Sequence, residues 1–315
     1  SVLTRPNPRD VKDVLVVACG AVVKAGTFIP YPDIENITIC DIEPLVPQVV
    51  TPMFGKENYH IVDGIAEENP HTVQGKQVRV VYDDGRHYIR TLPDDVKFDI
   101  ITSDPIDPWV KGCAALNTVE YYQMCKEHLN PGGVMTLWMP LYESDHETVK
   151  SLISTFFKVF PDGMFFSNDL GGVGYDAVLL GYAEPTRVDL DRLQQTLESP
   201  DFSRVKASLE EVGFGADTVD LRLETNIWQD PAIALMATYA GRAPDLGAWM
   251  EGAQLNTDRN MRLQYLAGMA INLQLREEIL DGILEYYKFP GDIFSGSPEN
   301  IRVLQTALQA VKRTP

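Results

Sequence analysis

The chain has 315 residues, a formal net charge of −18 and a hydrophobic content of 44%. This length is enough for one large domain, or for one domain with an appendage. The negative charge argues against nucleic-acid binding and against attachment to anionic membrane surfaces, because phosphate groups would repel the protein. It is compatible with a small cationic substrate, and also with a charge that only keeps the protein in solution.

The cysteines and histidines have no spacing typical of a metal site, so we predict no bound metal. We expect free thiols in a reducing compartment, and hence a cytoplasmic protein that is either free or peripheral to a membrane complex. No apolar run approaches the roughly 18 residues that span a bilayer. The first residue is Ser1 rather than Met, so we expect the chain to be processed, tagged or a fragment.

The first half of the chain alternates apolar runs with helical patterns, which predicts an α/β fold with a parallel sheet. A helix is expected from a cap at Asn117 or Thr118 to residue 129, with 130–133 as its stop, and a second helix over 143–160. Residues 55–77 form a polar insertion. The predicted strands cover 14–19, 36–40, 78–82, 98–103 and 134–139, followed by a hairpin of 164–167 and 177–182 across 171–174.

From about residue 185 helical periodicity replaces the strand signals. We therefore divide the chain into an α/β domain over 1–185 and a mostly helical region over 186–315. The helical patterns cover 188–197, 203–212, 230–239, 262–287 and 298–311.

Acidic residues follow three successive predicted strands, at Asp41, at Asp83 and Asp84, and at Asp104. The first strand ends instead in a turn at Gly20, where a ligand can approach the backbone. This order suits an adenosine nucleoside, because acids at these strand ends can accept hydrogen bonds from ribose hydroxyls and from the adenine amino group. The alternative is that each of these aspartates only forms a turn or caps a helix.

The glycine turn departs from the usual nucleotide-binding patterns. Ala18 and Val22 occupy the first and third glycine positions of G-x-G-x-G, and only Gly20 and Gly26 remain. Ala18 costs little if its φ is negative, whereas Val22 would crowd a ligand that approaches the backbone. A dinucleotide is therefore not expected, and a ligand without phosphate at the turn fits better.

These segments together resemble the spermidine synthase (polyamine aminopropyltransferase) family, most closely its bacterial branch that is often fused to a transporter-like membrane region. The helices after about residue 268 have no counterpart that we can place. The matching segments are 5–8, 14–26, 41–44, 83–86, 103–110, 129–133, 138–142 and 255–260.

The resemblance implies a doubly wound Rossmann-like, S-adenosylmethionine-type transferase fold. Its ligand would be S-adenosylmethionine, the decarboxylated form or methylthioadenosine, with a small cationic amine as the second substrate. By this resemblance Asp41 holds the ribose, Asp84 holds the adenine amino group, and Asp104 lies near the sulfonium and the amine. Asp104 is the predicted catalytic residue, with Asp107 and Asp169 as weaker candidates. The predicted nucleoside-binding residues are Gly20, Asp41, Asp83, Asp84, Gly85 and Ser103.

Two further departures bear on catalysis. The family usually reads D-S-S-D-P after the fourth strand, and we expect Ile101 to stand where the leading acid orients and deprotonates the amine. The family also has an N-terminal β-rich domain, whereas this chain begins almost at its first strand.

Three functions therefore stay open. The first is transfer of an aminopropyl or related group to a small cationic amine. The second is methyl transfer, which uses the same nucleoside placement and needs no strong base. The third is a structural subunit of a larger assembly, in which the C-terminal helices dock a protein partner or a membrane complex.

Overall fold

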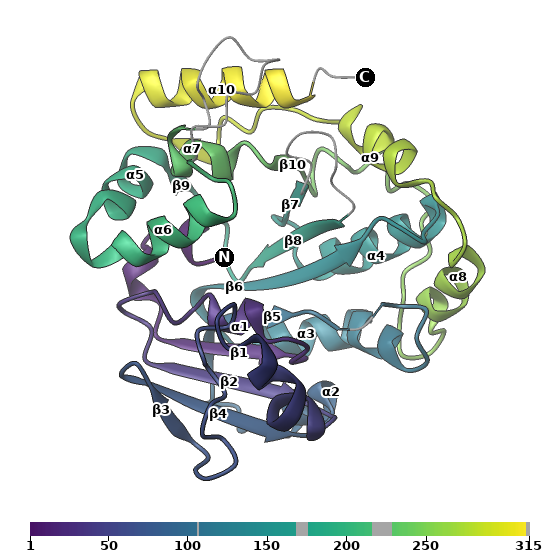
Figure 1. Ribbon diagram of the computed structural model, residues 1–315. Helices are drawn as coiled ribbons and strands as arrows, with labels where there is room; N and C mark the ends of the chain where they lie inside the picture. Colours follow the sequence, from purple (N-terminus) through teal and green to yellow (C-terminus); the bar gives the residue numbers. More distant parts are fainter. Residues whose placement is uncertain (106, 168–175, 216–228, 313–315) are drawn as a thin grey trace.

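A nine-stranded sheet runs through the computed structural model, which describes residues 1–105, 107–167, 176–215 and 229–312 (Figure 1). The strand order is β10-β7-β8-β6-β5-β1-β2-β4-β3. The strands are β1 Asp13–Val17, β2 Asn36–Asp41, β3 His71–Val73, β4 Lys76–Tyr82, β5 Phe98–Ser103, β6 Leu129–Pro140, β7 Met164–Ser167, β8 Asp176–Tyr182 and β10 Tyr239–Arg242. A separate parallel pair consists of β9 Val188–Asp189 and β11 Phe294–Ser295.

The five central strands, β4, β2, β1, β5 and β6, are parallel and confirm the five strands predicted first. The chain moves outward from β1 through β2 to β4, and then returns to the other side of β1 with β5 and β6. This reversal defines a doubly wound α/β sheet, in which ligands bind at the carboxyl ends of the strands beside the reversal. Strands β3, β7, β8 and β10 complete the sheet with antiparallel pairing.

Helices cover both faces of the sheet (Figure 1). Alternate strand residues enter two cores: Val14 and Val16 face one side, and Leu15 and Val17 face the other, against α2, α3 and α4. No helix within the described ranges has both the length and the apolar character needed to cross a bilayer. The helices are α1 Val23–Gly26, α2 Gly85–Thr91, α3 Val119–Glu127, α4 His146–Val159, α5 Leu190–Glu198, α6 Ser203–Glu211, α7 Pro231–Met236, α8 Arg262–Ala270, α9 Arg276–Leu284 and α10 Pro298–Lys312.

The cap of α3 is confirmed, but its predicted stop is wrong. Thr118 accepts a hydrogen bond from the Tyr121 backbone N–H at the start of the helix. The helix ends at Glu127, and residues 130–133 already belong to β6. The strand begins irregularly, because the pairing register between β5 and β6 shifts there and Gly132 has a φ of +68°.

The C-terminal half contributes a strand that its helical periodicity does not predict. The pattern over 230–239 gives the short helix α7, and β10 then pairs antiparallel with β7 at the edge of the sheet. The pattern over 262–287 forms two helices, α8 and α9, rather than one. The predicted turn at 171–174 lies outside the described residues, and the division of the chain near residue 185 stays a prediction.

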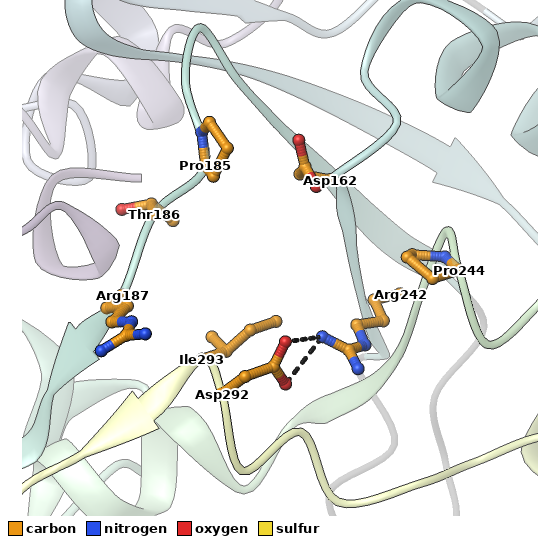
Figure 2. Close-up of a pocket in the computed structure, with 8 residues that line it drawn as sticks. All are labelled: Asp162, Pro185, Thr186, Arg187, Arg242, Pro244, Asp292 and Ile293. Atoms are coloured by element: carbon orange, nitrogen blue, oxygen red, sulfur yellow. Dashed lines mark hydrogen bonds and ion pairs between the residues drawn. The ribbon is translucent and has the colours of Figure 1, made fainter.

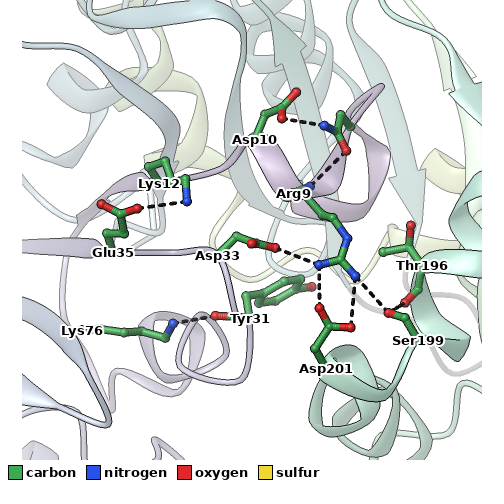
Figure 3. Close-up of polar contacts among 11 residues, drawn as sticks. Arg9, Asp10, Lys12, Tyr31, Asp33, Glu35, Lys76, Thr196, Ser199 and Asp201 are labelled. Carbon is green, nitrogen blue, oxygen red and sulfur yellow. Dashed lines mark hydrogen bonds and ion pairs between the residues drawn. The ribbon is translucent and has the colours of Figure 1, made fainter.

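Two arginines join segments that are distant in the sequence, the first between the two halves of the chain and the second within the C-terminal half. Arg9 donates to both carboxylate oxygens of Asp201, at 2.6 and 3.0 Å (Figure 3). Its guanidinium also lies over the Phe202 ring. Arg242 of β10 donates to both oxygens of Asp292, just before β11 (Figure 2). These paired contacts fix the helical segments in one orientation.

Asn256 is a buried polar link between distant segments. Its side-chain NH2 donates to the carbonyls of Ala114 and Asn117, each at 2.9 Å, and its side-chain oxygen accepts from the Leu263 N–H at 3.0 Å. The side chain is fully buried. This single amide therefore connects α8 to the segment that precedes α3.

We predict that Asn256→Ala lowers the free energy of unfolding by about 3 kcal/mol, because it leaves three buried backbone groups without partners. Urea denaturation measures the change. Asn36→Ala is the matched control, because the exposed Asn36 loses a single hydrogen bond to Asp13. Equal losses of stability in the two variants would contradict the assigned role of Asn256.

Candidate active site

The carboxyl ends of four central strands are joined by backbone hydrogen bonds. The Ala18 N–H donates to the Cys40 carbonyl at 2.9 Å, and the Asp83 N–H donates to the Asp41 carbonyl at 3.1 Å. The Asp104 N–H donates to the Val17 carbonyl at 3.1 Å. The strand-end acids predicted from the sequence therefore lie along one edge of the sheet.

Asp41 joins β2 to the glycine turn. Its Oδ2 accepts from the Cys19 N–H at 2.6 Å, and its Oδ1 accepts from the Glu43 N–H at 2.8 Å. An ionised carboxylate accepts roughly four hydrogen bonds, so about two acceptor positions remain on this half-buried side chain. These positions can serve ligand hydroxyls.

Asp83 and Asp84 follow β4 and begin α2. Asp84 caps the helix by accepting from the His87 N–H at 2.8 Å, and Asp83 contacts the His87 ring at 2.7 Å. Gly85 is buried, and an added Cβ would lie 2.5 Å from the Val17 side chain. Close packing of α2 on β1 thus accounts for Gly85, while the exposed Asp84 keeps acceptor capacity towards solvent.

The glycine turn holds three residues with positive φ: Ala18 at 72°, Gly20 at 51° and Val22 at 57°. The low cost expected for Ala18 depended on a negative φ, and the structure gives it a positive φ. Left-handed backbone is strained at alanine and more so at a β-branched residue. Thr51 supports the turn by donating to the Gly20 carbonyl at 3.0 Å.

A pocket of about 190 Å³ lies between this turn and Asp104. Cys19 lines it, and burial raises the pKa of the Cys19 thiol to about 12, so the thiol stays protonated at neutral pH. The described lining consists otherwise of small or apolar residues, apart from Lys24 and Asp104.

Lys24 of α1 is the site residue that the sequence interpretation missed. Its ammonium lies 2.9 Å from Asp104 Oδ2. The signal for it was a lysine four residues after Gly20, in the segment that leads from the turn into the first helix. The structure thus pairs the predicted catalytic acid with a cation.

Ser103 and Ile101 point away from the pocket. The Ser103 hydroxyl is buried and lies 3.4 Å from the Tyr121 hydroxyl. Ile101 lies inside β5, paired with Leu15 and Met135, and its side chain is 0% exposed. The expectation that Ile101 replaces a catalytic acid is wrong, because a side chain at this position packs in the core below the edge of the sheet.

The D-S-S-D-P pattern fits three residues later in the sequence. Read from Asp104, its first, fourth and fifth positions are Asp104, Asp107 and Pro108. The leading acid then comes directly after β5, at the ligand-binding edge. No carboxylate is missing in this register.

Asp107 belongs to a cluster of aromatic and acidic side chains beside this edge. It accepts from the Tyr142 hydroxyl at 3.1 Å, and burial together with Asp107 raises the pKa of that hydroxyl. The Tyr142 ring contacts Trp109 and Trp138, with centroids 6.1 and 6.3 Å apart. Trp138 Nε1 donates to Asp176 Oδ2 at 3.0 Å, while Asp176 Oδ1 is buried with no hydrogen-bond partner among the described residues.

The C-terminal half supports the loop that carries Asp107. Gln264 of α8 donates to the Trp109 carbonyl at 3.0 Å and accepts from the Gly112 N–H at 3.1 Å. Arg86 of α2 pairs with Asp258 and donates to the Ala115 carbonyl. Residues distant in sequence therefore hold the edge of the candidate site.

Asp169, the remaining candidate, lies outside the described residues. Within the described ranges, no group of three or more histidine, cysteine, aspartate or glutamate side chains has the arrangement needed to hold a metal ion.

Part of the chain is similar to known proteins. The spermine/spermidine synthase domain matches residues 3–167. The polyamine aminopropyltransferase of Clostridium beijerinckii is 28% identical over 160 residues, which cover 50% of each protein. The corresponding enzyme of Lachnospira eligens is 26% identical over 157 residues, which cover 48% of this chain and 49% of that protein. The chain thus spans about half the length of the curated relatives it matches.

Two solved structures are similar to part of the chain. Spermidine synthase from Thermotoga maritima has a TM-score of 0.45 and 20% identity, with 58% of this chain and 57% of that chain covered. A probable spermidine synthase from Corynebacterium glutamicum has a TM-score of 0.45 and 18% identity, with 78% and 72% covered.

We predict that Asp84→Ala lowers the free energy of unfolding by about 1 kcal/mol, because α2 loses its cap. Asp84→Asn keeps an oxygen acceptor and should change stability little. Thermal or urea denaturation of both variants tests the difference. A similar loss in the asparagine variant would show that capping is not what Asp84 contributes.

Proposed function

The chain belongs to the spermine/spermidine synthase domain family, and from this premise we propose that it is an aminopropyltransferase-like enzyme. Its substrates are S-adenosylmethionine or the decarboxylated form, and a small cationic amine. The observation that carries the proposal is the gathering of Asp41, Asp84 and Asp104 along one edge of the sheet, beside a pocket at the glycine turn.

The nucleoside lies across the ends of β1, β2 and β4 in this proposal. The free acceptor positions of Asp41 take the ribose hydroxyls, and Asp84 accepts from the adenine amino group. The sulfonium then reaches the pocket between the turn and Asp104. Asp83 and Gly85 position this edge without reaching the ligand, because one contacts His87 and the other packs on Val17.

The amine binds beside the sulfonium, against the cluster of Asp107, Trp109, Trp138, Tyr142 and Asp176. The aromatic rings offer π-faces to a cation, and the two acids offer opposite charge. The unpartnered Oδ1 of Asp176 supports this placement, because a buried acceptor gains most from a charged donor.

The reaction is an in-line substitution that depends mainly on positioning. The amine nitrogen forms a bond to the carbon beside the sulfonium, and the carbon–sulfur bond breaks. Its electron pair stays on sulfur, so methylthioadenosine leaves as a neutral thioether. Asp104 takes the proton that the amine must lose.

We predict that Asp104→Asn lowers kcat by about 10²-fold to 10⁴-fold, the range for loss of a general base. Product formation from putrescine measures the rate of transfer. Calorimetry with methylthioadenosine measures the affinity for the nucleoside. Nucleoside affinity should be retained, and the exposed control Asp95→Asn should keep full activity. Undiminished transfer in Asp104→Asn would remove Asp104 from the mechanism, and failure of the wild type to bind methylthioadenosine would overturn the proposed function.

We predict that Asp176→Asn raises the KM for the amine about tenfold with a smaller change in kcat, because one charge-assisted contact is lost. Steady-state kinetics with varied amine separates the two constants. Asp162→Asn, an exposed acid in the pocket of Figure 2, is the matched control. A lower kcat at constant KM would contradict the assigned role in amine binding.

A further inference from the structure

A lysine, Lys24, lines the pocket beside Asp104, and the proposed function gives it no role. Lys24 Nζ lies 2.9 Å from Asp104 Oδ2, and the two side chains are 32% and 36% exposed. Lys24 and Asp104 are the only charged residues among the described residues that line the pocket. A partly exposed ammonium thus lies next to the acid proposed to act on the amine.

The two candidate donors, S-adenosylmethionine and its decarboxylated form, differ in the charge of the tail that would be transferred. The sulfonium carries the adenosyl group, a methyl group and the tail to be transferred, and the tail has room in this pocket once the sulfonium lies near Asp104. The decarboxylated donor ends in an ammonium alone, which Lys24 repels. The intact donor carries a carboxylate as well as that ammonium, and the carboxylate can pair with Lys24.

Resting on the proposed function, we infer that Lys24 binds the tail carboxylate and that the preferred donor is S-adenosylmethionine itself. The transferred group is then 3-amino-3-carboxypropyl rather than aminopropyl. The amine nitrogen bonds to the tail carbon beside sulfur, and the carbon–sulfur pair leaves with methylthioadenosine. The ligand carboxylate takes over the Lys24 ammonium, which frees Asp104 to accept the amine proton.

The backbone at the turn is consistent with this assignment. Ala21, Val22 and Val23 lead from the glycine turn to Lys24 and carry no acid that would hold the lone ammonium of a decarboxylated tail. The short helix α1 holds the Lys24 backbone in place. Its Gly26 packs so closely on Asn58 that an added Cβ would clash with the Asn58 carbonyl oxygen. Lys24 is therefore held at the pocket by its backbone, while its side chain can exchange partners.

The test compares three ligands by calorimetry: methylthioadenosine, S-adenosylmethionine and its decarboxylated form. The wild type should prefer S-adenosylmethionine over the decarboxylated form, and Lys24→Met should lower that preference about tenfold or more. Lys24→Arg should retain most of it. Lys12→Met is the matched control, because Lys12 also has an ion pair of 2.9 Å, with Glu35, outside the pocket.

Methylthioadenosine separates the two levels of the proposal, because it has no charged tail. Its affinity should be the same in all four proteins, which also shows that the variants are folded. An unchanged donor preference in Lys24→Met, with methylthioadenosine bound normally, would overturn the inference and leave the proposed function standing. A wild type that binds no methylthioadenosine would overturn the proposed function and this inference with it.

Mass spectrometry of the product identifies the transferred group. Incubation of the wild type with S-adenosylmethionine and putrescine should yield methylthioadenosine and an amine that carries an added carboxylate. Formation of S-adenosylhomocysteine would show methyl transfer and overturn the inference. A protein that transfers a group only from decarboxylated S-adenosylmethionine, and not from S-adenosylmethionine, would also overturn it.

Discussion

The position of β1 between β2 and β5 is the constraint on which the candidate site depends. Because the chain leaves β1 in one direction and returns on its other side, the ends of β2, β4 and β5 all meet at the same edge. Backbone hydrogen bonds between these ends keep them in register. The acids at Asp41, Asp84 and Asp104 owe their proximity to this topology, since they lie far apart in the sequence.

The C-terminal half supports the candidate site through residues that are distant from it in the sequence. Gln264 and Asn256 hold the segment after Asp107, and β10 extends the sheet beside β7. A loop fixed at several points loses little freedom when a ligand binds, so the contacts contribute to preorganisation of the site. The helical segments are thus integrated with the α/β core through buried polar links as well as apolar packing.

Lys24 places one positive charge among the acids of the candidate site. A row of carboxylates alone would favour any cation, including both the amine and a decarboxylated tail. With a tail carboxylate bound to Lys24, as inferred above, this ammonium separates a part of the edge for an anion from the part near Asp107 and Asp176 that attracts cations. The inferred division would give the two proposed substrates separate places.

The sequence by itself determined the five central strands, a helix cap at Asn117 or Thr118 and the acids at the strand ends, because these follow from local periodicity and turn chemistry. Only the tertiary structure decided which residues of β5 lie at the edge of the sheet and which lie in the core. It placed Ile101 in the core and Asp104 at the edge, and it formed the Lys24–Asp104 pair. Such pairing depends on strand order and on the path of the chain through space, which no local pattern encodes.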